Sequence, residues 1–260
     1  MLRRKSTKPA STSAQQLQYE RWFQTPLGRQ LLARERDMIR QAIKGFYGYH
    51  LLEIPVSHRM PVGQGSLVGH HITAISNWHK GMPDGTLVTL PHELPFDSDS
   101  MDLVILHHTL DFAEEAHQLL REAARVLVSG GHLVIVGFNP YSLWGVRKIL
   151  GPCKQAPWTG RFLSPARLED WLALLDFRVK ERHYDFYQPP LKNLGWLHAL
   201  NFLNRWGARA RLPIGAYYTV VAQKRVAALI RMKPKWRRIV NVGTMPAVNR
   251  VSREQKNECC

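Results

Sequence analysis

Two adjacent histidines, His107 and His108, follow the apolar run MDLVIL and are the residues best placed to do chemistry. They come where a buried strand ends, and open α/β sheets bind their ligands at that edge. Because successive side chains of a strand point to opposite faces, one of the two imidazoles should face the ligand crevice. A neutral imidazole there could accept a proton from a nucleophile. The alternative is a pair of histidines that only form hydrogen bonds at a strand end.

The histidines do not predict a metal site. His70 and His71 form a second adjacent pair, and neighbouring residues on a strand point apart. No spacing of histidines or cysteines completes the ligand set that zinc requires. We therefore expect no metal.

A carboxylate follows another apolar strand, in the stretch GYHLLEIPVSHR at residues 48–59. Glu53 and Ile54 end this strand, because Pro55 lacks the amide that a central ladder needs. In many nucleotide-binding sheets the first strand ends in glycines that let backbone amides approach the ligand. The next glycines come in VGQGSLVG, residues 62–69, and neither follow the strand directly nor open a helix. We interpret that stretch as an ordinary loop.

The elements that must position these residues alternate along the chain. Thr25 and Pro26 predict a helix start, and apolar residues at helical spacing continue to Gly45. Strands are expected at residues 48–54, 71–76, 87–90, 101–106, 132–138, 177–187 and 216–224, and further helices at 113–128 and from Ser164. This order predicts a doubly wound, mostly parallel α/β sheet whose last strand is antiparallel. The strands that end at Ile54 and Leu106 should then border one cleft.

Positive charge is concentrated at the two ends of the 260-residue chain. Of the formal net charge of +16, residues 1–10 carry +4 and residues 224–260 carry +8. A basic tail favours nucleic acid or anionic lipid as a partner, and a merely solvated tail is the alternative. We expect a disordered basic arm at residues 1–19, a domain at 20–225 with an insertion at 188–213, and a basic C-terminal tail at 226–260.

The cysteines predict a reducing compartment. Cys153, Cys259 and Cys260 offer no framework of paired spacings. No apolar run approaches the ~20 residues of a membrane helix, and no secretory apolar region follows the basic start. We therefore expect a cytoplasmic protein without a transmembrane segment, and the sequence does not predict its oligomeric state.

The segment LPFDSDSMDLVILHHTLDFAEEAHQLLREAARVLVSGGHLVIVGF resembles the second half of a class I S-adenosylmethionine-dependent methyltransferase of the type 11 family. That family has a Leu-Pro-Phe turn, an Asp-led hydrophobic strand, an Arg-Val-Leu helix end and a Gly-Gly turn. The matching residues are Leu94, Pro95, Phe96, Asp102, Leu103, Val104, Arg125, Val126, Leu127, Gly130 and Gly131. The flanking pieces WFQTPLGRQLL, FYGYHLL, FNPYSLWGVRK and LEDWLALLDF resemble an uncharacterised bacterial branch of the family, so the resemblance spans about residues 20–225.

The resemblance implies a seven-stranded Rossmann-like methyltransferase fold and methyl transfer from S-adenosylmethionine to an unknown acceptor, by direct displacement at the sulfonium methyl. By position it implies cofactor contacts for Glu53, Ile54, Ser76, Leu90, His92 and Glu93, and an acceptor-side place for His107 and His108. The family's glycine turn and ribose-binding acid are replaced by Ile54, Pro55 and Ser76. The rival hypothesis is therefore a catalytically inactive, cofactor-free binding module that takes up RNA through its basic tails.

Overall fold

The computed structural model describes residues 12–78, 80–83, 85–151, 155–190, 201–210 and 212–226. The chain divides into two units, Met1–Ala227 and Ala228–Cys260, and the second lies outside the described residues. The predicted basic tail beyond residue 226, the first eleven residues of the predicted basic arm and most of the first half of the predicted insertion also lie outside them.

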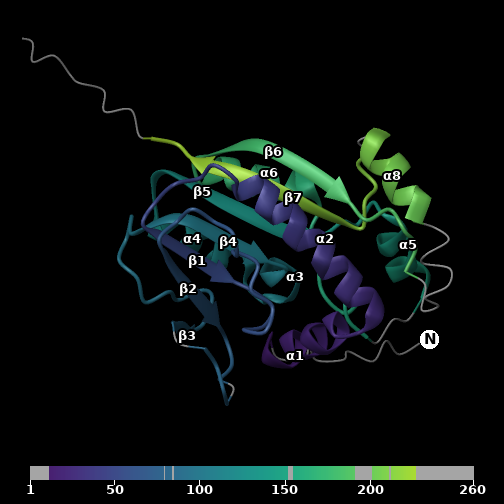
Figure 1. The fold of residues 1–260 in the computed structure, drawn as a ribbon, viewed down its shortest axis with the longest axis horizontal. Helices are drawn as coiled ribbons and strands as arrows, with labels where there is room; N and C mark the ends of the chain where they lie inside the picture. The colour runs from purple at the N-terminus through teal and green to yellow at the C-terminus, as the bar shows by residue number, and fades with distance from the viewer. Residues whose placement is uncertain are drawn as a thin grey trace, which may run out of the picture. The chain divides into compact units, whose positions relative to one another are not determined.

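Seven strands form one sheet in the order β3-β2-β1-β4-β5-β7-β6 (Figure 1). The strands are β1 His50–Ile54, β2 His70–Ile75, β3 Thr86–Val88, β4 Met101–His107, β5 Leu127–Phe138, β6 Phe177–Asp185 and β7 Tyr217–Lys224. The last strand, β7, runs antiparallel to β5 and β6, and all other neighbours are parallel. The predicted doubly wound sheet with an antiparallel last strand is confirmed.

The two central strands end side by side. In the parallel pair of β1 and β4, Ile54 lies opposite Leu106. The strand order reverses at this pair, since β2 lies beyond β1 on one side and β5 beyond β4 on the other. Such a reversal leaves a crevice at the carboxyl edge of the sheet, where ligands of this architecture bind. The prediction that these two strands end at one edge is confirmed.

Helices cover both faces of the sheet and create two hydrophobic cores. Strand residues such as Leu51 and Leu103 pack with α1 and α2, and Figure 1 shows α2 crossing β5 and β7. The alternate residues, such as Leu52 and Val104, pack with α4 and α6 on the other face. The described helices are α1 Thr12–Phe23, α2 Pro26–Ile43, α3 Thr109–Phe112, α4 Ala116–Val126, α5 Leu143–Leu150, α6 Pro165–Leu174 and α8 Asn201–Ala210.

Local chemistry explains where the helices begin and end. The Thr25 hydroxyl accepts a hydrogen bond from the amide of Gly28, and Pro26 occupies the first turn of α2, as predicted. The helix predicted over residues 113–128 is shorter than expected. Helix α3 ends at Phe112, residues 113–115 form a turn, α4 covers Ala116–Val126, and Leu127 already pairs with Met101 in the sheet.

Helix α1 corrects the prediction of a disordered arm through residue 19. The chain is helical from Thr12, and Tyr19 and Phe23 are buried in the core. Gln16 and Glu20 lie on the same buried face. Because polar residues occupy positions that an apolar stripe would normally fill, the helical period was hidden in the sequence.

Candidate functional site

A cavity of about 410 Å³ opens at the carboxyl edge of the sheet. Its wall comes from three segments: Ser76 directly after β2, residues 90–93 after β3, and residues 109–119 after β4. Four residues with predicted cofactor contacts line this cavity, namely Ser76, Leu90, His92 and Glu93. The structure thus brings these four residues together, and their contact with a cofactor stays a prediction.

An arginine from α4 holds the chain that follows the cavity wall. Arg125 donates to the carbonyl oxygens of Leu94 and Phe96, at 2.9 and 2.8 Å. Glu122 binds the Arg125 guanidinium and accepts from the Leu94 amide at 3.2 Å. This guanidinium lowers the pKa of Glu122. The Arg of the Arg-Val-Leu pattern therefore ties the Leu-Pro-Phe turn to α4, which fixes one end of the wall.

Glu53 is buried and already has partners within the chain. Its Oε2 accepts from the amides of Val62 and Gly63, at 3.0 and 2.8 Å, and its Oε1 accepts from the Thr73 hydroxyl at 2.7 Å. A Cβ atom on Gly63 would lie 3.1 Å from Oε2, so glycine permits this close approach. The VGQGSLVG stretch is a loop, as predicted, and it folds back onto the carboxylate.

Ile54 contributes to the site through its backbone. The Thr109 hydroxyl donates to the Ile54 carbonyl oxygen at 2.7 Å and thereby ties the end of β1 to the turn after β4. The Ile54 side chain is buried in the core on the α4 face. Neither Glu53 nor Ile54 lines the cavity, and their predicted contacts with a cofactor stay predictions.

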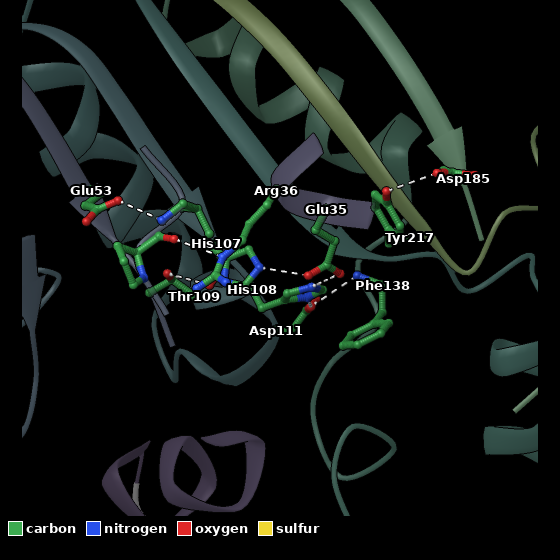
Figure 2. A network of polar contacts seen from close by, with 12 residues as sticks. Glu35, Arg36, Glu53, His107, His108, Thr109, Asp111, Phe138, Asp185 and Tyr217 are labelled. Atoms are coloured by element: carbon green, nitrogen blue, oxygen red, sulfur yellow. Dashed lines mark hydrogen bonds and ion pairs between the residues drawn. The ribbon is translucent and has the colours of Figure 1, made fainter. Parts of the chain in front are cut away.

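His107 and His108 belong to a sealed polar cluster (Figure 2). Their Nε2 atoms lie 2.9 and 2.8 Å from the two carboxylate oxygens of Glu35 in α2. His108 Nδ1 lies 2.7 Å from Asp111 Oδ2, which also accepts from the Phe138 amide. His108 has a left-handed backbone, with φ of 55°, and this turns its ring to the same side as that of His107. The expectation that adjacent histidines point apart fails at this turn.

The side chains of Glu35, His107, His108 and Asp111 have no solvent contact. Burial and the neighbouring charges therefore shift their pKa values in opposite directions. Burial raises the pKa of Glu35, but the facing imidazoles outweigh it and lower that pKa to about 2. Burial lowers the pKa of His108, but Glu35 and Asp111 outweigh it and raise that pKa to about 9. Burial also lowers the pKa of His107 and raises that of Asp111.

Sequence reasoning missed Glu35 and Asp111. A signal for Glu35 was present, because it stands four residues from Leu31 and from Ile39 on the buried face of α2. A glutamate on an apolar helical stripe indicates a buried partner. Asp111 had no such signal, since only the left-handed turn at His108 brings it beneath the imidazole.

Helix α1 covers part of the carboxyl edge. Gln16 donates to the Val56 carbonyl oxygen at 2.8 Å, and Glu20 accepts from the Ser57 hydroxyl at 2.8 Å. The Phe23 ring lies over both histidines, with centroid distances of 5.6 Å to His107 and 5.4 Å to His108. The histidines are therefore closed off from solvent by a helix that comes before the sheet.

None of the helices in the described part of the chain has the length and hydropathy to cross a membrane.

The chain is similar in sequence to a known protein family and to individual bacterial proteins. Residues 73–135 match the family described as a methyltransferase domain. The chain is 32% identical over 231 residues to YafS of Escherichia coli K12, an uncharacterised protein, covering 85% of this chain and 88% of YafS. It is 30% identical over 197 residues to the uncharacterised protein Rv2003c of Mycobacterium tuberculosis, covering 70% of this chain and 66% of that one.

Solved structures share the fold at low sequence identity. An S-adenosylmethionine-dependent methyltransferase from Thermotoga maritima matches with a TM-score of 0.55 and 20% identity, over 80% of this chain and 95% of that one. A second such methyltransferase, from Archaeoglobus fulgidus, matches with a TM-score of 0.52 and 19% identity, over 75% of this chain and 94% of that one. The seven-stranded Rossmann-like fold predicted from the sequence is therefore confirmed.

Proposed function

Since the chain belongs to the type 11 family of class I S-adenosylmethionine-dependent methyltransferases, we propose that it transfers a methyl group from S-adenosylmethionine to an acceptor. The observation that carries this proposal is the cavity of about 410 Å³ at the carboxyl edge. It lies beside the strand pair where the sheet order reverses, which is the place where open α/β sheets bind ligands. The acceptor is unidentified, and the cytoplasm is the proposed location because the cysteines show no disulfide framework.

The chemistry of the cavity wall fits S-adenosylmethionine. When bound, this cofactor supplies an electrophilic methyl group on a positively charged sulfonium. Glu93 and Glu115 bring carboxylates to the wall, which complement that charge and can accept hydrogen bonds from ribose hydroxyls. Leu90 and Phe112 offer apolar surface to the adenine ring. Ser76 stands where the family has a ribose-binding acid, so Glu93 and Glu115 are the proposed replacements.

The residues of this chain would act mainly by positioning. A displacement at carbon is accelerated when donor and acceptor are held in line and water is excluded. Arg125 serves this by fixing the wall at Leu94, and Thr109 by tying the turn after β4 to β1. His107 and His108 keep their predicted acceptor-side role as a prediction, since both are fully buried and Phe23 is one of the rings that cover them.

Calorimetric titration of the full chain with S-adenosylmethionine and S-adenosylhomocysteine tests the proposal. We expect saturable binding, and we expect Ala113→Trp to weaken it at least about tenfold, because an indole at this wall position fills the cavity. Leu174→Trp is the matched control, since Leu174 is exposed on α6 and distant in sequence from every wall segment. No heat and no thermal shift at millimolar ligand would contradict the proposal.

The alternative function is a cofactor-free binding module, and one observation favours it. Both oxygens of Glu53 are occupied by the protein's own chain, and the following Pro55 has no amide to offer a ligand. In that case the folded protein would bind RNA with a steep salt dependence, and deletion of residues 1–10 and 226–260 would abolish that affinity. RNA affinity that is unchanged by the deletion would exclude this version.

A further inference from the structure

The sealed cluster at the turn after β4 contains a set of potential metal ligands. One carboxylate oxygen of Glu35, one ring nitrogen of His107 and one of His108 lie within 4.8 Å of one another, and all three residues are buried. They come from two separate parts of the fold, the middle of α2 and the end of β4 (Figure 2). Within the described ranges this is the one group of three such residues that meets this distance.

We propose that Glu35, His107 and His108 bind one divalent transition-metal ion, with Zn²⁺ as the first candidate, and that this ion clamps α2 to the end of β4. Two imidazole nitrogens with one carboxylate oxygen suit borderline ions such as Zn²⁺ and Fe²⁺. Ca²⁺ and Mg²⁺ prefer oxygen ligands, so they fit this set poorly. The proposal is independent of methyl transfer, because none of the three residues lines the cavity.

The surroundings of His108 are those of a metal ligand. Histidines that bind metals usually donate their second ring nitrogen to a carboxylate or carbonyl, which fixes the tautomer and the ring orientation. Here His108 Nδ1 lies 2.7 Å from Asp111 Oδ2, and the Phe138 amide holds the same oxygen at 3.1 Å. Asp111 is therefore a positioning residue that would keep His108 Nε2 free of its proton and turned toward the ion.

Formal charge gives a second argument. Without an ion, the Glu35–His107, Glu35–His108 and His108–Asp111 contacts each need one proton, on the nitrogen or on the oxygen. The four groups then share a net charge of −1 where no solvent reaches, and a buried net charge is costly. The cations of Arg36 and Lys148 lie near the cluster and donate to the carbonyl oxygens of Pro61 and Gly160. A divalent ion with two neutral imidazoles balances both carboxylates.

The contacts among the proposed ligands are already short. Two other buried atoms of the cluster, His107 Nδ1 and Asp111 Oδ1, have no hydrogen-bond partner among the described residues, and an ion on the Nε2 atoms would leave both unchanged. The Glu35 oxygens lie 2.8 and 2.9 Å from the imidazole nitrogens. Two ligand atoms about 2.1 Å from one zinc ion are roughly 3.0 to 3.4 Å apart. Binding therefore lengthens the two Glu35–histidine contacts slightly and brings the three ligand atoms, now within 4.8 Å of one another, to about this spacing.

Elemental analysis of the full chain, purified without a metal-affinity step and loaded with Zn²⁺ or Fe²⁺, tests the proposal. We expect near-stoichiometric metal that survives extensive dialysis. Glu35→Gln and His107→Gln should each weaken retention of the ion at least about tenfold. A Co²⁺-loaded protein should show ligand-field absorption bands that both variants lose.

The control variant removes the exposed imidazole pair, in which His50 Nδ1 and His70 Nδ1 lie 3.3 Å apart. The double variant H50Q/H70Q should keep its ion. Metal that is lost from this control but retained by Glu35→Gln would show an adventitious ion only and would overturn the proposal. So would metal-free protein after loading.

A measurement on the unmodified protein covers the case in which the variants do not fold. A strong chelator such as dipicolinate should lower the melting temperature, and Zn²⁺ but not Mg²⁺ should restore it. A melting temperature that the chelator leaves unchanged would also overturn the proposal. Bound metal would also exclude the predicted proton-accepting role of His107. With an ion on Nε2 and the ring proton on Nδ1, the imidazole has no free nitrogen to accept a proton.

Discussion

Replacement of Glu53 by glutamine and by alanine separates two roles of its carboxylate. Oε2 accepts from the Val62 and Gly63 amides, and Oε1 accepts from the Thr73 hydroxyl. A glutamine can keep all three hydrogen bonds, because its carbonyl oxygen accepts from both amides and its amide group donates to the hydroxyl oxygen. Glu53→Gln should therefore lose only the added strength of bonds to a charged acceptor, about 1–2 kcal/mol in total.

Glu53→Ala should be much less stable, because it leaves both amides without an acceptor. Val62 and Gly63 are buried, and each unsatisfied buried group costs about 1–3 kcal/mol. With the lost bond to Thr73, worth about 1 kcal/mol, the total is about 3–7 kcal/mol. For a domain of this size the melting temperature should fall by roughly 6–28 °C, against roughly 2–8 °C for Glu53→Gln.

Differential scanning calorimetry of the two variants checks this order, and titration with S-adenosylmethionine adds a second readout. If Glu53 only holds the loop at Val62 and Gly63, the dissociation constant of Glu53→Gln stays at the unmodified value. If the carboxylate also contacts the cofactor, as the family resemblance implies, binding should weaken about tenfold or more. A Glu53→Gln protein as unstable as Glu53→Ala would refute the reasoning from hydrogen bonds.

Two further predictions concern contacts that support the cavity and its cover. Arg125→Met should lower the melting temperature by roughly 4–8 °C, because it loses hydrogen bonds to the Leu94 and Phe96 carbonyl oxygens that are worth about 2 kcal/mol. It should also weaken cofactor binding, although Arg125 does not line the cavity. Unchanged binding in a scanning-fluorimetry titration would show that the wall holds its shape without the arginine. Tyr19→Phe should lower the melting temperature by roughly 2–4 °C, because the buried Tyr19 hydroxyl donates to the Pro157 carbonyl oxygen at 3.0 Å. A melting temperature equal to that of the unmodified protein would show that this hydrogen bond does not stabilise the fold.

The sheet could be predicted because each strand coincides with a short apolar stretch of the sequence. The near-continuous apolar run at residues 101–106 predicted a strand that is buried on both faces, and β4 has this burial. Helix α1 could not be predicted in the same way, since Gln16 and Glu20 are buried through hydrogen bonds to distant loops. Their partners, Val56 and Ser57, are specified only by the tertiary fold.

The candidate site likewise contains residues whose positions could be predicted and residues whose positions could not. Ser76 and Leu90 follow strands, and the carboxyl ends of parallel strands meet at one edge, so their gathering at the cavity followed from the predicted topology. The approach of Glu35 to His107 depends on how α2 crosses the sheet. Strand and helix periods contain no information about that crossing, so a metal site was not expected.

The docking of α1 sets an order of events during synthesis. Tyr19 binds a carbonyl that lies 138 residues further along the chain, and Gln18 has a partner 141 residues away in Thr159. At about 5–20 residues per second, the first helix is translated roughly 7–28 s before these partners. Phe23 thus has no completed surface to close during that interval. An ion or small molecule that ends up enclosed beneath the helix has its widest access while the polypeptide is still growing.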